Sequence, residues 1–162
     1  MTAGHDVYSQ FLDSLLQSEA VRKSSLEQRA LAVITTSAAL VTLLSGLAAI
    51  SSHYRSFRIL SESGHWFFAS SILFVLAAIV GIVVNAPLFY GQIELTKKTL
   101  KDAWDDNVSD AQAAVASARL EQLTAARHAN TIKAWALLIS TVFEVGAVGL
   151  LTVAVGYAFL PA

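Results

Sequence analysis

Three long apolar stretches dominate the pattern of hydrophobic and polar positions along this chain. The first, from Ala30 to Ile50, and the second, from Trp66 to Tyr90, contain no charged residue. The third runs from Ala134 to Leu160 and contains only Glu144. A helix needs roughly 20 residues to cross a hydrocarbon core of about 30 Å. The pattern therefore predicts three membrane-spanning helices, at residues 30–50, 66–88 and 134–160.

The first stretch is the least decisive of the three, because hydroxyl side chains dilute it. These are Thr35, Thr36, Ser37, Thr42 and Ser45. Its alternative is a buried helix in a soluble bundle. Composition favours the membrane, since the chain is 55% hydrophobic and 14% charged, with a mean hydropathy of +0.57. A soluble domain is about 25% charged, so we expect an all-α membrane protein in contact with the lipid bilayer.

Residues 6–28 predict an amphipathic helix ahead of the first span. Its apolar side chains recur at helical spacing; they are Val7, Tyr8, Phe11, Leu12, Leu15 and Leu16. Such a helix either lies in the membrane interface or packs against other cytoplasmic helices. We favour packing, because the polar face carries Asp13 and Glu19 rather than mainly basic residues. A segment of this kind is not a secretory signal, so we expect no cleavage.

The pattern at residues 91–133 predicts a cytoplasmic helical hairpin between the second and third spans. Pro87 marks a kink or an end of the second span. From about Asp110 no glycine or proline interrupts the chain before Gly146, so one long helix should continue into the third span. A heptad seam of mostly alanine follows this helix, at Val108, Ala111, Val115, Ala118, Gln122, Ala125, Ala129 and Ile132. The alternative is an alanine-rich helix whose seam has no partner.

Basic residues set the predicted orientation. Nine of the 11 Lys and Arg residues lie before the first span or within 91–133, whereas Arg55 and Arg58 lie between the first two spans. The positive-inside rule then places the N-terminus and residues 91–133 in the cytoplasm. With three spans, the C-terminus lies outside. We expect a multi-pass protein of the plasma (inner) membrane.

The sequence carries no motif for catalysis or for cofactor binding. It has no cysteine, and its four histidines are too scattered to form a metal-ligand set. It has neither a glycine-rich phosphate loop nor a nucleophile–base signature. Acidic residues are interspersed with the basic ones, so no nucleic-acid-binding stripe is formed. We therefore predict no enzymatic activity, no cofactor, no metal and no nucleic-acid partner.

Glu144 is the one carboxylate within the predicted spans. A charge at mid-membrane costs a few kcal/mol and is tolerated when it faces a bundle interior, a water path or a partner. The spans contain no basic residue to pair with it, but four hydroxyls of the first span can hydrogen-bond to it: Thr35, Thr36, Ser37 and Thr42. In a symmetric oligomer, one Glu144 from each copy would form a ring that attracts cations. The alternative is a protonated Glu144 that donates one structural hydrogen bond between helices.

Small residues within the spans predict self-association. Glycines let membrane helices approach closely, and the candidates for such packing are Gly46, Gly146, Gly149 and Gly156. A chain with three spans has no large cavity of its own. We therefore expect it to assemble as a homo-oligomer.

The chain resembles the small transmembrane effectors of bacterial cyclic-nucleotide antiphage defence, the Pycsar and CBASS membrane effectors. The likeness lies in the order of the helices, in "SLEQRALAVITTSAALVTLLSGL" at the first span and in "VVNAPLFY" at the end of the second. Glu27 and Arg29 match the acidic–basic pair that precedes the first span in that family. The resemblance implies an inner-membrane effector that responds to a nucleotide signal and impairs the membrane.

Two functions therefore stand as expectations. The first is a homo-oligomeric effector or channel-like protein, in which Glu144 and the hydroxyl-rich first span line an ion path. The second is a structural or interaction protein whose cytoplasmic hairpin docks a protein partner.

Overall fold

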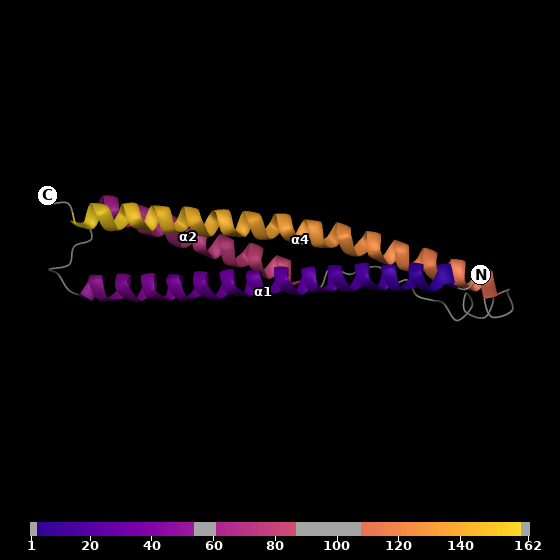
Figure 1. Cartoon of the computed structure of the whole chain (residues 1–162). Coiled ribbons are helices and arrows are strands. Elements are labelled where there is room, and N and C mark those ends of the chain that lie inside the picture. Colours follow the sequence, from indigo (N-terminus) through magenta and orange to yellow (C-terminus); the bar gives the residue numbers. More distant parts are fainter. Residues whose placement is uncertain (1–2, 54–60, 87–107, 160–162) are drawn as a thin grey trace. The chain divides into compact units, whose positions relative to one another are not determined.

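The computed structural model describes residues 3–53, 61–86 and 108–159. These residues form three helices: α1 (Ala3–His53), α2 (Ser61–Asn85) and α4 (Val108–Phe159) (Figure 1). The described residues contain no strand. Each helix contains a segment long and apolar enough to cross a membrane, within Val7–Ile50, Ser63–Asn85 and Ala113–Tyr157. The predicted all-α, membrane-helix class is confirmed.

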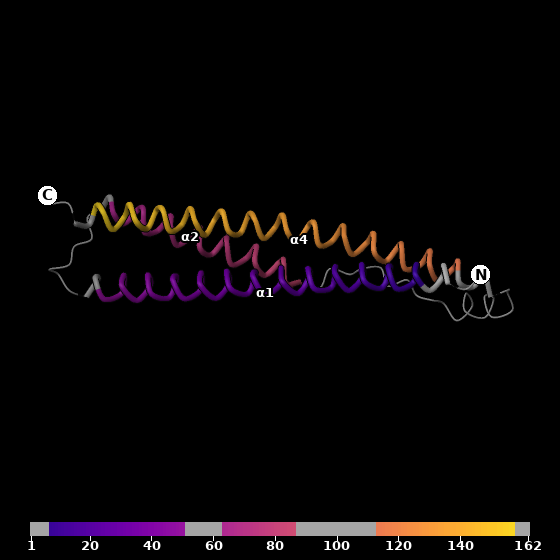
Figure 2. The backbone as a smooth tube through the Cα atoms, viewed as in Figure 1, coloured from indigo at the N-terminus to yellow at the C-terminus, as the bar shows by residue number. Residues whose placement is uncertain are grey.

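The helix bounds follow from the positions of glycine and proline. The amphipathic segment 6–28 and the span 30–50 form one uninterrupted helix, α1, because no glycine or proline lies between Gly4 and Gly46 (Figure 2). Likewise α4 continues into the third span, which confirms the predicted long helix. α2 ends at Asn85, two residues before Pro87, since the residue that precedes a proline disfavours the helical conformation. The first part of the predicted hairpin, 91–107, lies outside the described residues.

The chain divides into two compact units, and α1 and α4 contribute to both. The first unit contains Met1–Ser25 and Pro87–Lys133, and the second contains Leu26–Ala86 and Ala134–Ala162. In the second unit, Ser70 contacts Ala147, and Ala77 contacts Ser140. A step of seven residues forward along α2 is thus a step of seven residues back along α4. The two helices are therefore antiparallel.

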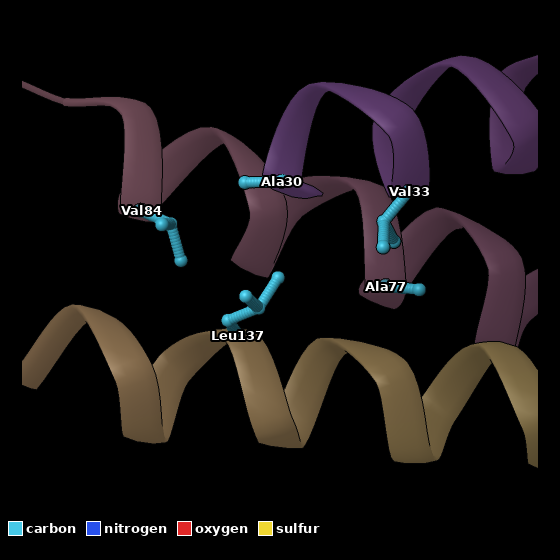
Figure 3. Packing of buried hydrophobic residues seen from close by; sticks show 5 residues of the cluster. All are labelled: Ala30, Val33, Ala77, Val84 and Leu137. Carbon is cyan, nitrogen blue, oxygen red and sulfur yellow. The ribbon is translucent and has the colours of Figure 1, made fainter. Parts of the chain in front are cut away.

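The second unit buries one stripe of each helix at alternating spacings of three and four residues. On α2 the buried residues are Ser63, Ser70, Phe74, Ala77, Gly81 and Val84, with Phe67 half-buried, and on α4 they are Leu137, Ser140, Ala147 and Ala154, with Glu144 and Leu151 half-buried at the same spacing. Figure 3 shows Ala30 and Val33 of α1 beside Ala77 and Val84 of α2 and Leu137 of α4. A second cluster forms around Leu44, Phe74 and Ala147. Spacing of this kind is that of left-handed helix packing.

The first unit joins α1 and α4 in parallel. Asp13 pairs with Arg119, and further along both helices Glu19 pairs with Arg127. On α4, Leu123, Asn130 and Lys133 are buried, and Arg119 and Ala126, which continue the same spacing, are half-buried. The predicted alanine seam stays a prediction, because its expected partner in the first part of the hairpin lies outside the described residues; Ala118, Ala125 and Ala129 are half-buried, whereas Val115 and Ile132 are 51% and 49% exposed. The contacts of α4 with α1 are made by Arg119 and Asn130, which pair with Asp13 and Glu19.

The apolar face of the N-terminal part of α1 is only partly covered. Leu12, Leu15 and Leu16 are half-buried. Val7 and Phe11 remain exposed. The sequence favoured packing of this helix against other cytoplasmic helices. In the structure such packing covers the leucines only in part and leaves Val7 and Phe11 in contact with the surroundings.

Candidate functional site

Glu144 and Thr36 form a hydrogen-bonded pair in the second unit. The hydroxyl of Thr36 on α1 donates to Oε1 of Glu144 on α4. Because both residues lie inside the apolar runs, the contact joins two helices within their predicted spans, at the seventh residue of 30–50 and the eleventh of 134–160. Sequence reasoning named this pair as one of several combinations, and the structure selects it.

The other hydroxyls named with Glu144 have different partners. Thr35 donates to the carbonyl oxygen of Leu31 at 2.8 Å, and Thr42 donates to that of Ala38 at 2.9 Å. Both bonds stay within α1, as is common for threonine in helices. Ser37 is fully buried, and its Oγ has no hydrogen-bond partner among the described residues. The structure thus brings one of the four hydroxyls to Glu144.

Thr36 has a choice of acceptors. Its Oγ1 lies 3.0 Å from the carbonyl oxygen of Ala32 and 3.1 Å from that of Val33, in addition to Glu144. A threonine hydroxyl carries one proton and two lone pairs. When the proton goes to the backbone, Oγ1 can accept from a protonated Glu144; when Glu144 is ionised, the proton goes to the carboxylate. The Thr36 hydroxyl can therefore bond to its own helix backbone as well as to Glu144.

The pair lies at the surface of the second unit. Glu144 is half-buried and Thr36 is exposed. A carboxyl that reaches the surface in the middle of a span is costly to place against lipid. It therefore requires cover from water or from another polypeptide.

The exposed faces of α1 and α2 differ in the size and polarity of their side chains. The exposed residues of α2 between 68 and 83 are all large and apolar: Phe68, Ile72, Val75, Leu76, Ile79, Ile82 and Val83. α1 exposes large apolar residues too, Leu31, Leu43, Leu47 and Ile50, but it also exposes many small and hydroxyl side chains: Thr35, Ala38, Ala39, Thr42, Ser45, Gly46 and Ala49. Large apolar side chains suit lipid, whereas small ones permit close helix contact.

The glycines named from the sequence have different surroundings. A Cβ at Gly46, Gly149 or Gly156 would meet nothing within 4 Å, and one at Gly146 would meet Leu73 at an ordinary 3.5 Å. None of them is therefore needed for close approach within the chain. That role belongs to Gly81 of α2, where a Cβ would lie 2.9 Å from Cγ1 of Ile34.

Three residues that the sequence reasoning missed hold α2 in place. They are Gly81, Ser70, which donates to the carbonyl oxygen of Ala147 at 2.8 Å, and Ser140, which donates to that of Ala77 at 2.6 Å. Ser70 and Ser140 are fully buried. The sequence did contain a signal for close packing of α2: Ser70, Ala77 and Gly81 are small residues, spaced seven and four apart along one face of the helix.

A second polar cluster surrounds Glu19 in the first unit. The amide of Asn130 donates to the backbone oxygen of Glu19 at 3.0 Å and to its Oε2 at 2.9 Å. Nη1 of Arg22 lies 3.8 Å from Oε2, and Nε of Arg127 lies 3.5 Å from Oε1. Asn130 is 1% exposed, and its Oδ1 has no partner among the described residues. Glu19 therefore contacts Arg22 of its own helix and both Asn130 and Arg127 of α4.

The described residues contain no group of three or more His, Cys, Asp or Glu side chains that could hold a metal ion. Comparisons with protein families, with curated proteins and with solved structures find no match to this chain. The functional argument therefore rests on the geometry of the described helices. What the geometry shows is a helical membrane protein with a polar pair within its predicted spans.

Proposed function

We propose that the chain is a homo-oligomeric, channel-like protein that conducts cations across, or otherwise perturbs, the bacterial inner membrane. One observation carries the proposal: the Thr36–Glu144 pair reaches the surface of the second unit within the predicted spans. Copies that cover this surface would bring one carboxylate each to a shared path, and rings of carboxylates attract cations. The resemblance to antiphage membrane effectors fits such a role, with a nucleotide signal as the trigger.

The small face of α1 supports self-association. This face carries hydroxyls and small residues where α2 carries only large apolar ones, so it is suited to another helix rather than to lipid. The glycines Gly46, Gly149 and Gly156 have open space beside them and so can accept a neighbouring copy. The excess of basic residues before the first span and in 91–133 supports a cytoplasmic N-terminus and an external C-terminus.

Ion flux into liposomes tests the proposal. Glu144→Gln keeps the shape of the side chain and removes its charge, so cation flux should fall severalfold at equal protein density. Glu121→Gln is the matched control, because Glu121 is exposed in the first unit, outside the uncharged runs. Absence of flux in the native protein, or equal flux in native protein and Glu144→Gln, would contradict conduction through a Glu144 path.

Self-association has an independent test, because the native chain has no cysteine. A cysteine introduced at Thr42, on the small face of α1, should form a disulfide between copies in membranes. A cysteine at Ile79, on the large apolar face of α2, should not. A chain that stays monomeric in nanodiscs and gives no disulfide at position 42 would contradict the oligomer, whatever the flux experiment shows.

An alternative interaction role, through the N-terminal part of α1 rather than through the predicted hairpin, also has an observation in its favour. Val7, Tyr8 and Phe11 are exposed by 66%, 74% and 58% in the first unit. Such side chains are typical of a surface that binds another protein. A stoichiometric soluble partner that is lost in Phe11→Ser, together with a native protein that conducts no ions, would favour a structural or interaction role.

A further inference from the structure

Arg22 and Arg127 converge on one carboxylate, although they lie on different helices. Arg22 of α1 approaches Oε2 of Glu19, and Arg127 of α4 approaches Oε1. The two guanidinium groups are therefore held within 4 Å of the same acidic side chain. Two positive charges face one negative charge, so the group has an excess of one positive charge.

The arginines are held loosely. Their distances to Glu19, 3.8 and 3.5 Å, are longer than the 2.7–3.2 Å of ordinary hydrogen bonds. Their side chains are 49% and 53% exposed, whereas the side chain of Glu19 is only 12% exposed. Asn130, which donates to Glu19, is buried, whereas both arginine side chains reach the solvent. An anion from solution can therefore approach both guanidinium groups without displacing Asn130.

We propose that Arg22 and Arg127 form a phosphate-binding clamp in which Glu19 stands in for the bound anion. Guanidinium groups bind phosphate oxygens in pairs of parallel hydrogen bonds. Each arginine can turn from Glu19 to the phosphate while Asn130 keeps Glu19 in place. This clamp belongs to the first unit and does not depend on the proposed ion path.

Two sources of phosphate can reach the clamp. Arg22 precedes the uncharged run at Ala30 by eight residues, and Arg127 precedes Ala134 by seven, which is about 10–12 Å along each helix. The headgroup layer extends roughly 5–8 Å beyond the hydrocarbon core. Arginine side chains bridge the remaining distance to a lipid headgroup. A soluble phosphate compound reaches the same groups from the aqueous side.

The experiment uses the full chain in nanodiscs of phosphatidylcholine alone or with phosphatidylglycerol. Native mass spectrometry measures retained phosphatidylglycerol, and broadening of the phosphorus resonance measures inorganic phosphate added to the neutral discs. Arg22→Gln and Arg127→Gln should each weaken binding about fivefold. Glu19→Gln should strengthen it, because the competing charge is lost while the glutamine oxygen still accepts from Asn130. If the other variants misfold, Arg22→Gln alone still tests the clamp. Its contact with Glu19 lies within α1, so its loss does not separate α1 from α4.

Arg29→Gln is the matched control. Arg29 is exposed and closer to the predicted membrane border than either clamp residue, so it experiences general attraction to anionic lipid at least as strongly. If Arg22→Gln and Arg127→Gln reduce the retention of phosphatidylglycerol, the bound phosphate is that of a lipid headgroup. If they reduce the broadening of the inorganic phosphate resonance, it comes from a soluble compound. An equal loss in Arg29→Gln, or no binding of either probe to the native chain, would overturn the proposal.

Discussion

The two units use the same helices but hold them together by different chemistry. In the first unit, α1 and α4 meet through charged and amide side chains, with Leu123 as the one buried hydrophobic residue among those described. In the second, the buried stripes are apolar or small, and serine hydroxyls bond to backbone oxygens of the next helix. The spacing of the stripes is the same in both.

The comparison shows that the spacing of the buried residues and their chemistry have different causes. Spacing at alternating three and four residues determines which side of a helix is covered. Residue chemistry follows the surroundings: water tolerates arginine and glutamate at the edge of a seam, whereas hydrocarbon favours small residues and internally satisfied hydroxyls. Glu144 is the exception, because it places a half-buried carboxyl beside the buried small and apolar residues of the second unit.

Asn130→Asp should give the largest effect and would break the seam of the first unit. The change replaces two donated hydrogen bonds to Glu19 with contacts between acceptors, and it buries a negative charge beside another. We expect a loss of about 3 kcal/mol in the stability of this unit. Hydrogen exchange of residues 7–25 and 113–133 measures it, with 66–85 as the internal reference.

Asn130→Leu is the control for that experiment. It removes the amide, whose Oδ1 has no partner among the described residues, and places an apolar side chain in a buried position. Oε2 of Glu19 loses its amide donor, which costs about 1–2 kcal/mol, but no second negative charge is added, so Asn130→Leu should be less damaging than Asn130→Asp. If Asn130→Leu were as damaging as Asn130→Asp, the volume of the side chain rather than its charge would determine the seam.

Gly81→Leu should have the next largest effect, this time in the second unit. Its Cβ would lie 2.9 Å from Ile34 and 3.4 Å from the backbone oxygen of Ala30, so α1 and α2 would have to separate. Overpacking of this kind costs about 1–3 kcal/mol. Thermal unfolding in detergent measures the loss.

Gly149→Leu is the matched variant for Gly81→Leu. Nothing lies within 4 Å of its Cβ position, so the fold of a single copy should keep its unfolding temperature. Only assembly should weaken, because a large side chain blocks close contact between helices. An equal loss of monomer stability in both variants would show that Gly81 has no special place in the packing.

Much of the fold was predictable from the sequence, because it depends on local features. Uncharged runs gave the three helices, and the absence of glycine and proline predicted the continuity of α4. The choice of seam was not predictable, since Val115 to Ile132 and Arg119 to Lys133 show the same spacing one residue apart. That choice depends on which side chains of α1 face α4, here Asp13 and Glu19, and such pairing is a tertiary property.

The candidate site was predictable in part for the same reason. Glu144 and Thr36 were named because a carboxylate and hydroxyls are rare in apolar runs. The selection of Thr36 over Thr35 or Thr42 depends on the rotation of α1, which the spacing of its buried residues sets only once the partners are known. Gly81 was missed because its role requires the close approach of Ile34 from another helix.

Ionic strength should give the smallest effect and the sharpest contrast between the two units. Asp13 and Arg119 pair at 3.0 Å but are 59% and 35% exposed, so their attraction contributes at most about 0.5 kcal/mol and is screened by salt. Asp13→Asn should therefore raise hydrogen exchange in 7–25 slightly at low salt and leave it unchanged at 1 M salt. Ser140→Ala removes a buried hydrogen bond of about 0.6 kcal/mol, and its effect on 66–85 should be the same at both salt concentrations. Salt dependence in the second variant would mean that water and ions reach the buried stripe of the second unit.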